Sequence, residues 1–337
     1  MKKALPIGKL DSDVLKKLIF DNIIFKRDEV LTGPGIGEDC AVLDFGDLEC
    51  VTSTDPITAS VNDIGRLSIH ISCNDIASNG VEPVAILLTV LLPEGTTEDD
   101  IEKIMHQAAH AAELSKVQIA GGHTEITRAV NQPVICSTAF GRSPKGGSQS
   151  AGDMQKGDLI FVTKALALEG TGIIASEKGA ELVRQGFLTE AERSEAAAML
   201  DKVSVVAEGV AAGKVGTHGM HDITEGGVLG GVWEMCNIAG CGAMLCEENM
   251  PLAPVTKKLA EHYGFNPLRM ISSGSMLIVA SPDKKAELTE ALKKEGVELT
   301  CIGEIGSKGE KVTMLTKDGS LSEVAPPSAD EIYRVIG

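Results

Sequence analysis

The stretch GPGIGEDCAVL at residues 33–43 joins closely spaced glycines to two adjacent acids and then to a short apolar run. The backbone N–H groups of Gly35 and Gly37 can approach an anion, and Glu38 and Asp39 can bind a cation. Taken alone, such a stretch is more often a solvated turn. Four more motifs, however, place an acid beside glycine or a small polar residue: STDP at 53–56, CNDIAS at 73–78, GGHTE at 121–125 and HDITEGG at 221–227.

These five motifs predict one magnesium–nucleotide site built from distant segments. Carboxylates that share a cleft repel each other unless they are protonated or bridged by a cation, and hard oxygen ligands select Mg²⁺, which usually binds phosphate as well. Asp55 stands at a strand end, where sites are often built. Asn74 and Asp75 lie within an amphipathic helix, where polar atoms near the buried face need a cation or a donor.

The GGHTE and HDITEGG motifs are interpreted as phosphate contacts. Gly121, Gly122 and Thr124 follow a short strand at 117–120, where the backbone can approach a phosphate closely. His123 is either a ligand or acid–base group, or a hydrogen-bonded structural histidine, which is the more common case. HDITEGG places Asp222 at the entry to a helix with Thr224 as its predicted cap, so the helix N-terminus can face a phosphate.

Two common nucleotide-binding motifs do not fit the sequence. The glycines at 33–37 lack the GxGxxG spacing and run into a strand instead of a helix. The stretch 209–215 is one residue short of a Walker A loop and lacks its Ser or Thr, so it is interpreted as a helix C-terminus. A nucleotide site in this chain must therefore use another architecture.

Composition narrows the class of protein. The chain has 337 residues, of which 43% are hydrophobic, and this length favours two domains. A net charge of −17 without any basic block argues against nucleic acid or an anionic membrane as partner. Because no apolar run could cross a bilayer and the N-terminus does not read as a signal peptide, we expect a cytoplasmic protein. The eight cysteines include no CxxC and are expected to be reduced and structural.

Hydrophobic periodicity predicts an α/β or α+β fold. The stretch 142–157 is rich in Gly, Ser and Lys, and we take it as a linker, which gives domains at 1–150 and 151–337. The first domain is expected to hold helices at 12–20 and 63–78, a helix that begins with a capping box at Thr97 and Asp100, and strands at 41–43, 50–53, 84–92, 117–120 and 133–140. The second is expected to hold helices at 172–177, 189–212, after HDITEGG and after Ser281-Pro282, and strands at 159–163, 276–280, 299–305 and 311–316.

The motifs, in this order, resemble those of the aminoimidazole ribonucleotide (AIR) synthase-like superfamily of ATP-dependent enzymes. GEDCAVL resembles its GDDAAVL, CNDIASNGVEP its N-D-[LI]-A-x-x-G-x-x-P, GGHTE its GGDT or GGET, and HDITEGGVLGG its HDxTxGG. The likeness covers nearly the whole chain. Within the superfamily the pattern looks most similar to the hydrogenase-maturation protein E group, whose members use ATP to dehydrate a carbamoyl group on their own C-terminal cysteine.

The resemblance implies a fold, a dimer and a set of ligands. It implies an N-terminal α/β domain whose strands pair with a second subunit in a homodimer, a C-terminal α+β domain, and ATP between the two. It further implies the Mg²⁺ ligands Asp39, Asp55 and Asp75, with Asn74, His123 and Glu125 close to the phosphates. We expect Asp222 or His123 to act as a base that orients the acceptor, and Lys9 to close over the phosphates.

Two departures from the family pattern leave several functions open. Position 123 is His where several relatives carry Asp, and the last cysteine is Cys301, so we expect ATP use without the cyanide-forming reaction. The leading hypothesis is a Mg-dependent enzyme that phosphorylates an oxygen of an amide, carbamoyl or phosphate-accepting substrate. The alternatives are a nucleotide-binding partner without turnover, and a kinase similar to thiamine-monophosphate kinase, whose DISDG motif is partly matched at 222–226.

Overall fold

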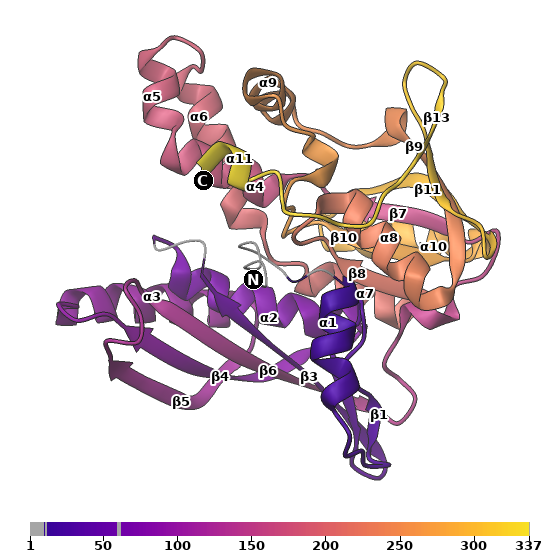
Figure 1. The fold of residues 1–337 in the computed structure, drawn as a ribbon, viewed down its shortest axis with the longest axis horizontal. Coiled ribbons are helices and arrows are strands. Elements are labelled where there is room, and N and C mark those ends of the chain that lie inside the picture. Colours follow the sequence, from indigo (N-terminus) through magenta and orange to yellow (C-terminus); the bar gives the residue numbers. More distant parts are fainter. Residues whose placement is uncertain (1–9, 11, 59–61, 337) are drawn as a thin grey trace, which may run out of the picture.

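Two sheets lie at opposite ends of the molecule, with helices packed between them (Figure 1). The structure is a computed structural model that describes residues 10, 12–58 and 62–336. The predicted phosphate-binding Lys9 lies outside the described residues.

The N-terminal sheet has six strands in the order β1-β2-β3-β6-β4-β5. Its neighbours are antiparallel except for the parallel pair β4 and β5. The strands are β1 (Val30–Thr32), β2 (Ala41–Asp44), β3 (Leu48–Ile57), β4 (Pro83–Leu92), β5 (Gln118–Ile126) and β6 (Val134–Pro144). The helical segments of this half are α1 (Ser12–Leu18), η1 (Phe20–Asn22), α2 (Ile64–Ser78) and α3 (Glu98–Leu114). Thr97 and Asp100 form the predicted capping box of α3.

Helices α2 and α3 cover only one face of the N-terminal sheet (Figure 1). The apolar run predicted as a strand at 84–92 forms β4, and from Ile86 onward its residues alternate between a buried and a more exposed face. Ile86 and Leu88 are buried, whereas Leu87 between them is 40% exposed. Val84, at a register shift in β4, is also exposed, at 48%. The outward face of the sheet is therefore apolar and uncovered in the single chain.

The C-terminal sheet has seven strands in the order β13-β12-β9-β11-β7-β10-β8. The strands are β7 (Leu159–Thr163), β8 (Gly219–Asp222), β9 (Cys241–Cys246), β10 (Met276–Ala280), β11 (Leu299–Lys308), β12 (Val312–Leu315) and β13 (Leu321–Glu323). The α-helices are α4 (Leu168–Glu177), α5 (Gly179–Arg184), α6 (Glu190–Ala197), α7 (Val206–Val215), α8 (Gly227–Ala239), α9 (Pro254–Tyr263), α10 (Lys285–Lys294) and α11 (Tyr333–Ile336). Short 3₁₀ turns are η2 (Ala151–Asp153), η3 (Ala198–Lys202), η4 (Glu247–Asn249), η5 (Pro267–Arg269) and η6 (Pro282–Lys284).

The predicted long helix at 189–212 is wrong. The segment is divided into α6, the turn η3 and α7, and the chain leaves the helical path at Val203–Val205. Contacts from elsewhere stabilise this break. The Asn74 amide donates to the Val203 carbonyl at 2.8 Å and accepts from the Val205 N–H at 2.8 Å.

The two halves of the chain share a core. Buried side chains of α2 and the N-terminal sheet form one cluster with Phe161 of β7, Val206 of α7 and Ile278 of β10. Helices α2 and α7 approach closely, since a Cβ on Gly209 would lie 2.5 Å from the Ala77 carbonyl oxygen. This seam places β8, at the edge of the C-terminal sheet, against α2.

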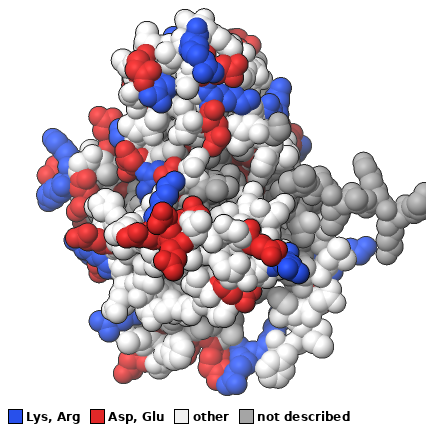
Figure 2. Space-filling view, turned by 90° about the vertical axis from the view of Figure 1, so that its left-hand side faces the viewer, with Lys and Arg blue, Asp and Glu red and all other residues white. Residues whose placement is uncertain are grey.

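The surface agrees with the charge balance of the sequence. On the face drawn in Figure 2, Lys and Arg side chains are scattered among Asp and Glu and form no continuous basic area. Within the described residues, no helix has the length and apolar character that a membrane span requires.

Candidate functional site

Four acids from the two halves of the chain interact at the seam. Asp39 precedes β2, Asp55 lies near the end of β3, Asp75 lies in α2, and Asp222 ends β8. Asp75 and Asp222 are 6% and 1% exposed. The Ser78 hydroxyl donates to Asp39 at 3.0 Å, and the Ser53 hydroxyl donates to Asp75 at 2.5 Å. We call Asp39, Asp55, Asp75 and Asp222 the seam acids.

The imidazole of His221 lies among the seam acids. Its Nδ1 atom lies 3.2 Å from an Asp39 carboxylate oxygen and 3.8 Å from an Asp222 oxygen, and its Nε2 atom lies 3.2 Å from a Glu234 oxygen. Nevertheless, the Nδ1 atom and the Asp222 Oδ2 atom are both buried without a hydrogen bond of normal geometry. Asp39, His221 and Asp222 offer ligand atoms that all lie within 4.8 Å of one another.

Burial and the neighbouring charges shift the pKa values of Asp75, Asp222 and His221. Burial, followed by the charges of Asp222 and Asp55, raises the pKa of Asp75 well above its usual value. Burial also raises the pKa of Asp222 to about 6, although His221 opposes the shift. Burial alone would lower the pKa of His221, but the adjacent carboxylates raise it well above its usual value. Concentrated negative charge of this kind favours a bound cation.

The glycine turn before Asp39 faces protein. Gly37 has a φ of 83°, and a Cβ there would lie 3.1 Å from both the Glu234 Cβ and the Ile238 side chain of α8. A Cβ on Gly35 would lie 2.9 Å from the Glu38 side chain. In the single chain, Gly37 therefore lets the turn pack on α8 beside His221.

The GGHTE motif is not at the seam. It was expected to follow a strand that ends at residue 120, but it lies inside the edge strand β5, which continues to Ile126. Asp55, Ser137, Leu88 and Gly122 are register partners across four strands. Three strand spacings of about 4.8 Å put Asp55 and Gly122 roughly 14 Å apart.

The side chains of this motif contact one another on the edge strand. His123 and Glu125 are largely exposed, and the His123 Nε2 atom lies 3.3 Å from a Glu125 oxygen. Gly121 and Thr124 are also exposed. Within one chain, the structure therefore does not bring this motif to the seam acids.

The first residues of the HDITEGG motif lie at the seam acids, and its last residues form the turn before α8. The predicted cap Thr224 is wrong, because the residue before α8 is Gly226, in a left-handed conformation. The Thr224 carbonyl instead accepts a turn hydrogen bond from the Gly227 N–H at 3.1 Å. Thus Asp222 and His221 belong to the site, and the glycines turn the chain into the helix.

Sequence reasoning did not select His221 and Glu234. His221 stands in the quoted HDITEGG motif, next to Asp222 on a short strand, which was a usable signal. Glu234 lies in α8, in a sequence that reads as an ordinary amphipathic helix, so only the folded structure reveals its contact with His221.

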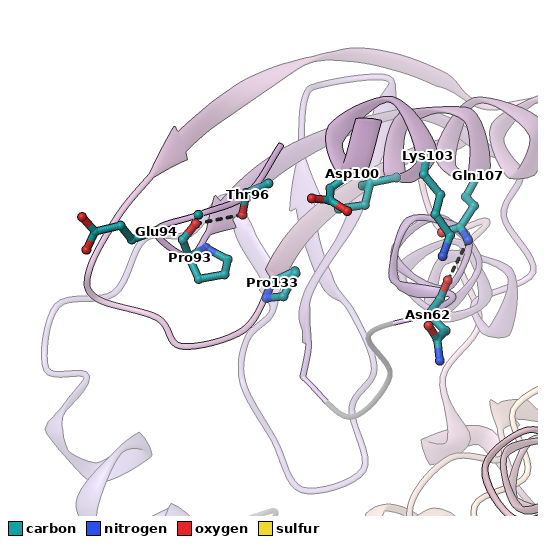
Figure 3. A pocket seen from close by; sticks show the side chains of 10 residues that line it. Asn62, Pro93, Glu94, Thr96, Asp100, Lys103, Gln107 and Pro133 are labelled. Atoms are coloured by element: carbon teal, nitrogen blue, oxygen red, sulfur yellow. Dashed lines mark hydrogen bonds between the residues drawn. The ribbon is translucent and has the colours of Figure 1, made fainter. Parts of the chain in front are cut away.

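A hollow lies away from the seam acids, at the end of the N-terminal sheet. It has a volume of about 420 Å³ and is lined by residues of the β4–α3 connection, of α3 and of two neighbouring loops (Figure 3). Gln107 crosses it to donate to the Asn62 carbonyl at 2.7 Å. None of the seam acids lines this hollow.

The donor set at the seam fits a hard divalent cation. Carboxylate oxygens converge there from four segments, and the Asp222 Oδ2 atom is buried without a partner. Oxygen ligands of this kind suit Mg²⁺. Among the described residues, the group of possible metal ligands found here is Asp39, His221 and Asp222, which lacks the thiols or several histidines typical of a zinc site.

Comparison with known proteins agrees with the fold. Models described as the N-terminal and C-terminal domains of AIR synthase related protein match residues 37–143 and 155–315. A protein of Methanocaldococcus jannaschii named for hydrogenase expression and formation is 26% identical over 292 residues, which cover 83% of this chain and 84% of that protein. The carbamoyl dehydratase HypE of Cupriavidus necator is 27% identical over 285 residues, which cover 83% and 78%.

Solved structures share the two-domain architecture. A hydrogenase maturation protein HypE in complex with ATP superposes with a TM-score of 0.71 at 21% identity, and the match covers 98% of each chain. A structure of ThiL complexed with AMPPCP and TMP superposes with a TM-score of 0.72 at 19% identity, and the match covers 95% of each chain. Matched in both halves by the family's models, this chain belongs to the AIR synthase related protein family.

Proposed function

We propose that the chain is a Mg-dependent, ATP-using enzyme that phosphorylates an oxygen of an amide, carbamoyl or phosphate-accepting substrate. The observation that carries the proposal is the convergence of the four seam acids, with an unpartnered Asp222 oxygen among them. Such a cluster is electrostatically costly without a cation, so its presence favours a site that binds one. The relatives named for carbamoyl dehydration and the solved HypE complex with ATP support the same class of chemistry.

Within this proposal each residue has a defined task. Asp39, Asp55 and Asp75 would hold Mg²⁺, and Mg²⁺ with ATP supplies a transferable phosphoryl group whose charge is neutralised. Asp222 would orient the acceptor and take its proton, because it is buried beside the other acids. His221, held by Glu234, would fix the orientation of Asp39.

The predicted phosphate-contacting residues outside the seam need a second copy of the chain. Gly121, Gly122, His123, Thr124 and Glu125 lie on the edge strand. We propose a homodimer formed through the uncovered face of the N-terminal sheet, which would give β5 a partner surface. The cytoplasmic location and the domain boundary near residue 150 remain predictions.

Two other functions predict different measurements. A small-molecule kinase, as suggested by the similarity in fold to ThiL, would transfer phosphate to a stable product. A nucleotide-binding partner without turnover would bind Mg–ATP and release no ADP or phosphate. Measuring ADP release with carbamoyl, amide and phosphate-monoester acceptors separates these cases from the leading proposal.

The Asp55→Asn variant tests the proposed site directly. Loss of one carboxylate should weaken Mg-dependent ATP binding at least tenfold, about 1.4 kcal/mol, as measured by calorimetry. Asp47→Asn is the matched control, because Asp47 is an exposed aspartate in the turn before the same strand. If Asp55→Asn binds Mg–ATP as tightly as the Asp47→Asn control, Asp55 does not belong to the site.

A further inference from the structure

A second buried group of acids lies on the far side of the Asp222–Gly227 turn. It consists of Glu169 at the start of α4, Glu225 in the turn, Asp330 and Tyr333 near the C-terminus, and Ser273 in the loop before β10; we call it the second acidic cluster. None of these residues was singled out by the motifs as a ligand. Glu169, Asp330 and Ser273 are 6%, 2% and 0% exposed.

Backbone contacts hold the four segments of the cluster together. The Ala167 N–H donates to the Ser272 hydroxyl at 2.7 Å, and the Gly170 N–H donates to the Ile271 carbonyl at 3.1 Å. The Asp222–Gly227 turn packs closely against the segment before this loop, because a Cβ on Gly227 would lie 2.6 Å from the Leu268 carbonyl oxygen. The cluster is thus a built feature of the fold.

Two of its acids are satisfied by hydrogen bonds. Asp330 accepts from the Gly226 N–H at 2.8 Å and from the Ile332 N–H at 2.8 Å. Glu225 accepts from the Tyr333 hydroxyl at 2.9 Å. Both carboxylate oxygens of Asp330 therefore already accept a hydrogen bond, whereas on Glu225 the Tyr333 hydroxyl uses one of the two oxygens.

Glu169 and Ser273 are not satisfied. The Glu169 Oε2 atom and the Ser273 Oγ atom are buried without a hydrogen bond of normal geometry, although the Ser273 hydroxyl and backbone N–H both lie close enough to Glu169 to stabilise its charged form. Burial, together with Asp330 and Glu225, raises the pKa of Glu169 to about 7, and Ser273 opposes the shift. An unmade hydrogen bond on a buried acid costs free energy, so these atoms need a donor.

The charge of the surroundings decides which donor fits. Within the described residues, no ion pair with Lys, Arg or His involves Glu169, Glu225 or Asp330. An anion would be repelled by three carboxyl groups. A cation that carries N–H groups would give hydrogen bonds to both open atoms and balance the acids.

We propose that the second acidic cluster binds an N–H-bearing cation, either an ammonium ion or the protonated amine of a small acceptor, through Glu169 and Ser273. Glu225 lies three residues after Asp222 in this turn, so the cluster adjoins the seam acids along the chain. The cluster would then bind the nitrogen end of the acceptor while Asp222 faces its reacting oxygen. Only this last assignment rests on the proposed function; binding of the cation does not.

The test measures cation binding without nucleotide. Thermal unfolding is followed while ammonium or methylammonium chloride replaces sodium chloride at constant ionic strength, with tetramethylammonium chloride as the cation that lacks N–H groups. Ammonium or methylammonium should raise the midpoint in a saturable way, and tetramethylammonium should not. A response to ammonium alone would identify the free ion, and an equal or larger response to methylammonium would identify an amine.

Variants locate the binding site. Glu169→Gln should weaken the apparent affinity at least about tenfold, and Ser273→Ala serves if Glu169→Gln does not fold. Glu177→Gln, an exposed substitution on the same helix, and Asp55→Asn, at the seam, should keep the response. An unchanged response in Glu169→Gln and Ser273→Ala, or equal responses to all three cations, would overturn the proposal and leave the open atoms to water. Because Asp55→Asn tests nucleotide binding separately, failure of one proposal is distinguishable from failure of the other.

Discussion

Asn74, next to the seam acid Asp75, stabilises the fold through hydrogen bonds to the C-terminal half of the chain. The family resemblance implied a place near the phosphates for Asn74. In the structure its amide group hydrogen-bonds the Val203 carbonyl and the Val205 N–H at the helix break, and the side chain is fully buried. An amide with one donor and one acceptor matches a carbonyl and an N–H that the broken helix leaves open. Its measurable role in this structure is therefore to join α2 to the C-terminal half.

Replacing Asn74 should destabilise the protein more than it weakens nucleotide binding. Asn74→Ala leaves the Val203 carbonyl and the Val205 N–H unpaired in the interior, so the free energy of unfolding should fall by about 2–4 kcal/mol. Urea unfolding measures this, with Asn237→Ala as the control because Asn237 is exposed on α8. A small loss of stability together with a tenfold loss of Mg–ATP affinity would instead return Asn74 to the phosphates.

At the level of single residues, the sequence predicted the acids better than their partners. Asp39, Asp55, Asp75 and Asp222 stand in motifs with glycine or small polar neighbours, and the structure brings them together. Glu234 has no such neighbours in its largely apolar helix, whereas Glu169 is followed by Gly170 and Thr171 but stands in none of the quoted motifs. Their roles come from tertiary contacts that local sequence does not encode.

At the level of elements, periodicity located most helices and strands but not their interruptions. No proline or glycine separates residues 198 and 206, so the sequence reads as one helix. The break depends on distant side chains: besides Asn74, the Lys164 ammonium donates to the Ser204 carbonyl at 2.7 Å and pairs with Glu208 at 2.8 Å. These hydrogen bonds stabilise the break, whereas the helix propensity of the segment alone would favour one continuous helix.

The two glycines of β5 allow a controlled test of its packing. Gly121 and Gly122 have φ values of 155° and 147°, so alanine strains the backbone similarly at either position. A Cβ on Gly122 would lie 1.9 Å from the Leu88 carbonyl oxygen of β4, whereas on Gly121 its nearest neighbour would be a Leu87 methyl at 3.7 Å. Close strand contact, rather than phosphate contact alone, therefore explains Gly122.

Gly122→Ala should destabilise the chain by about 2 kcal/mol more than Gly121→Ala, because β5 must move away from β4. Chemical unfolding of both variants measures the difference, and amide exchange in β4 and β5 shows whether the strands separate. Equal losses would mean that backbone strain dominates and that the strand approach is looser than the structure indicates.

At the level of the whole molecule, the order of elements was predictable and the arrangement of the two sheets was not. Strand and helix periods indicated an α/β or α+β fold, and the resemblance indicated two domains. The seam depends on α2 packing against α7 and against the edge strand β8, and both contacts join segments more than 100 residues apart. The alternation in β4 was also missed, because an apolar side chain can face either a core or another subunit.

The outward face of the N-terminal sheet is the surface through which we expect two copies of the chain to associate. Phe45, Leu48, Cys50 and Phe140 surround Val84 at a hollow of about 270 Å³ on the uncovered face of the N-terminal sheet. An exposed apolar area of this kind typically marks an interface, and the proposed homodimer would bury it against its copy. Light scattering should therefore give twice the chain mass of 35.3 kDa.

Val84→Glu would place an unpaired carboxylate in that interface and should raise the dissociation constant at least about a hundredfold. Leu315→Glu, on an exposed position of β12, is the control and should remain dimeric. If Val84→Glu is as dimeric as wild type, the copies associate through another surface, and β5 must find its partner elsewhere.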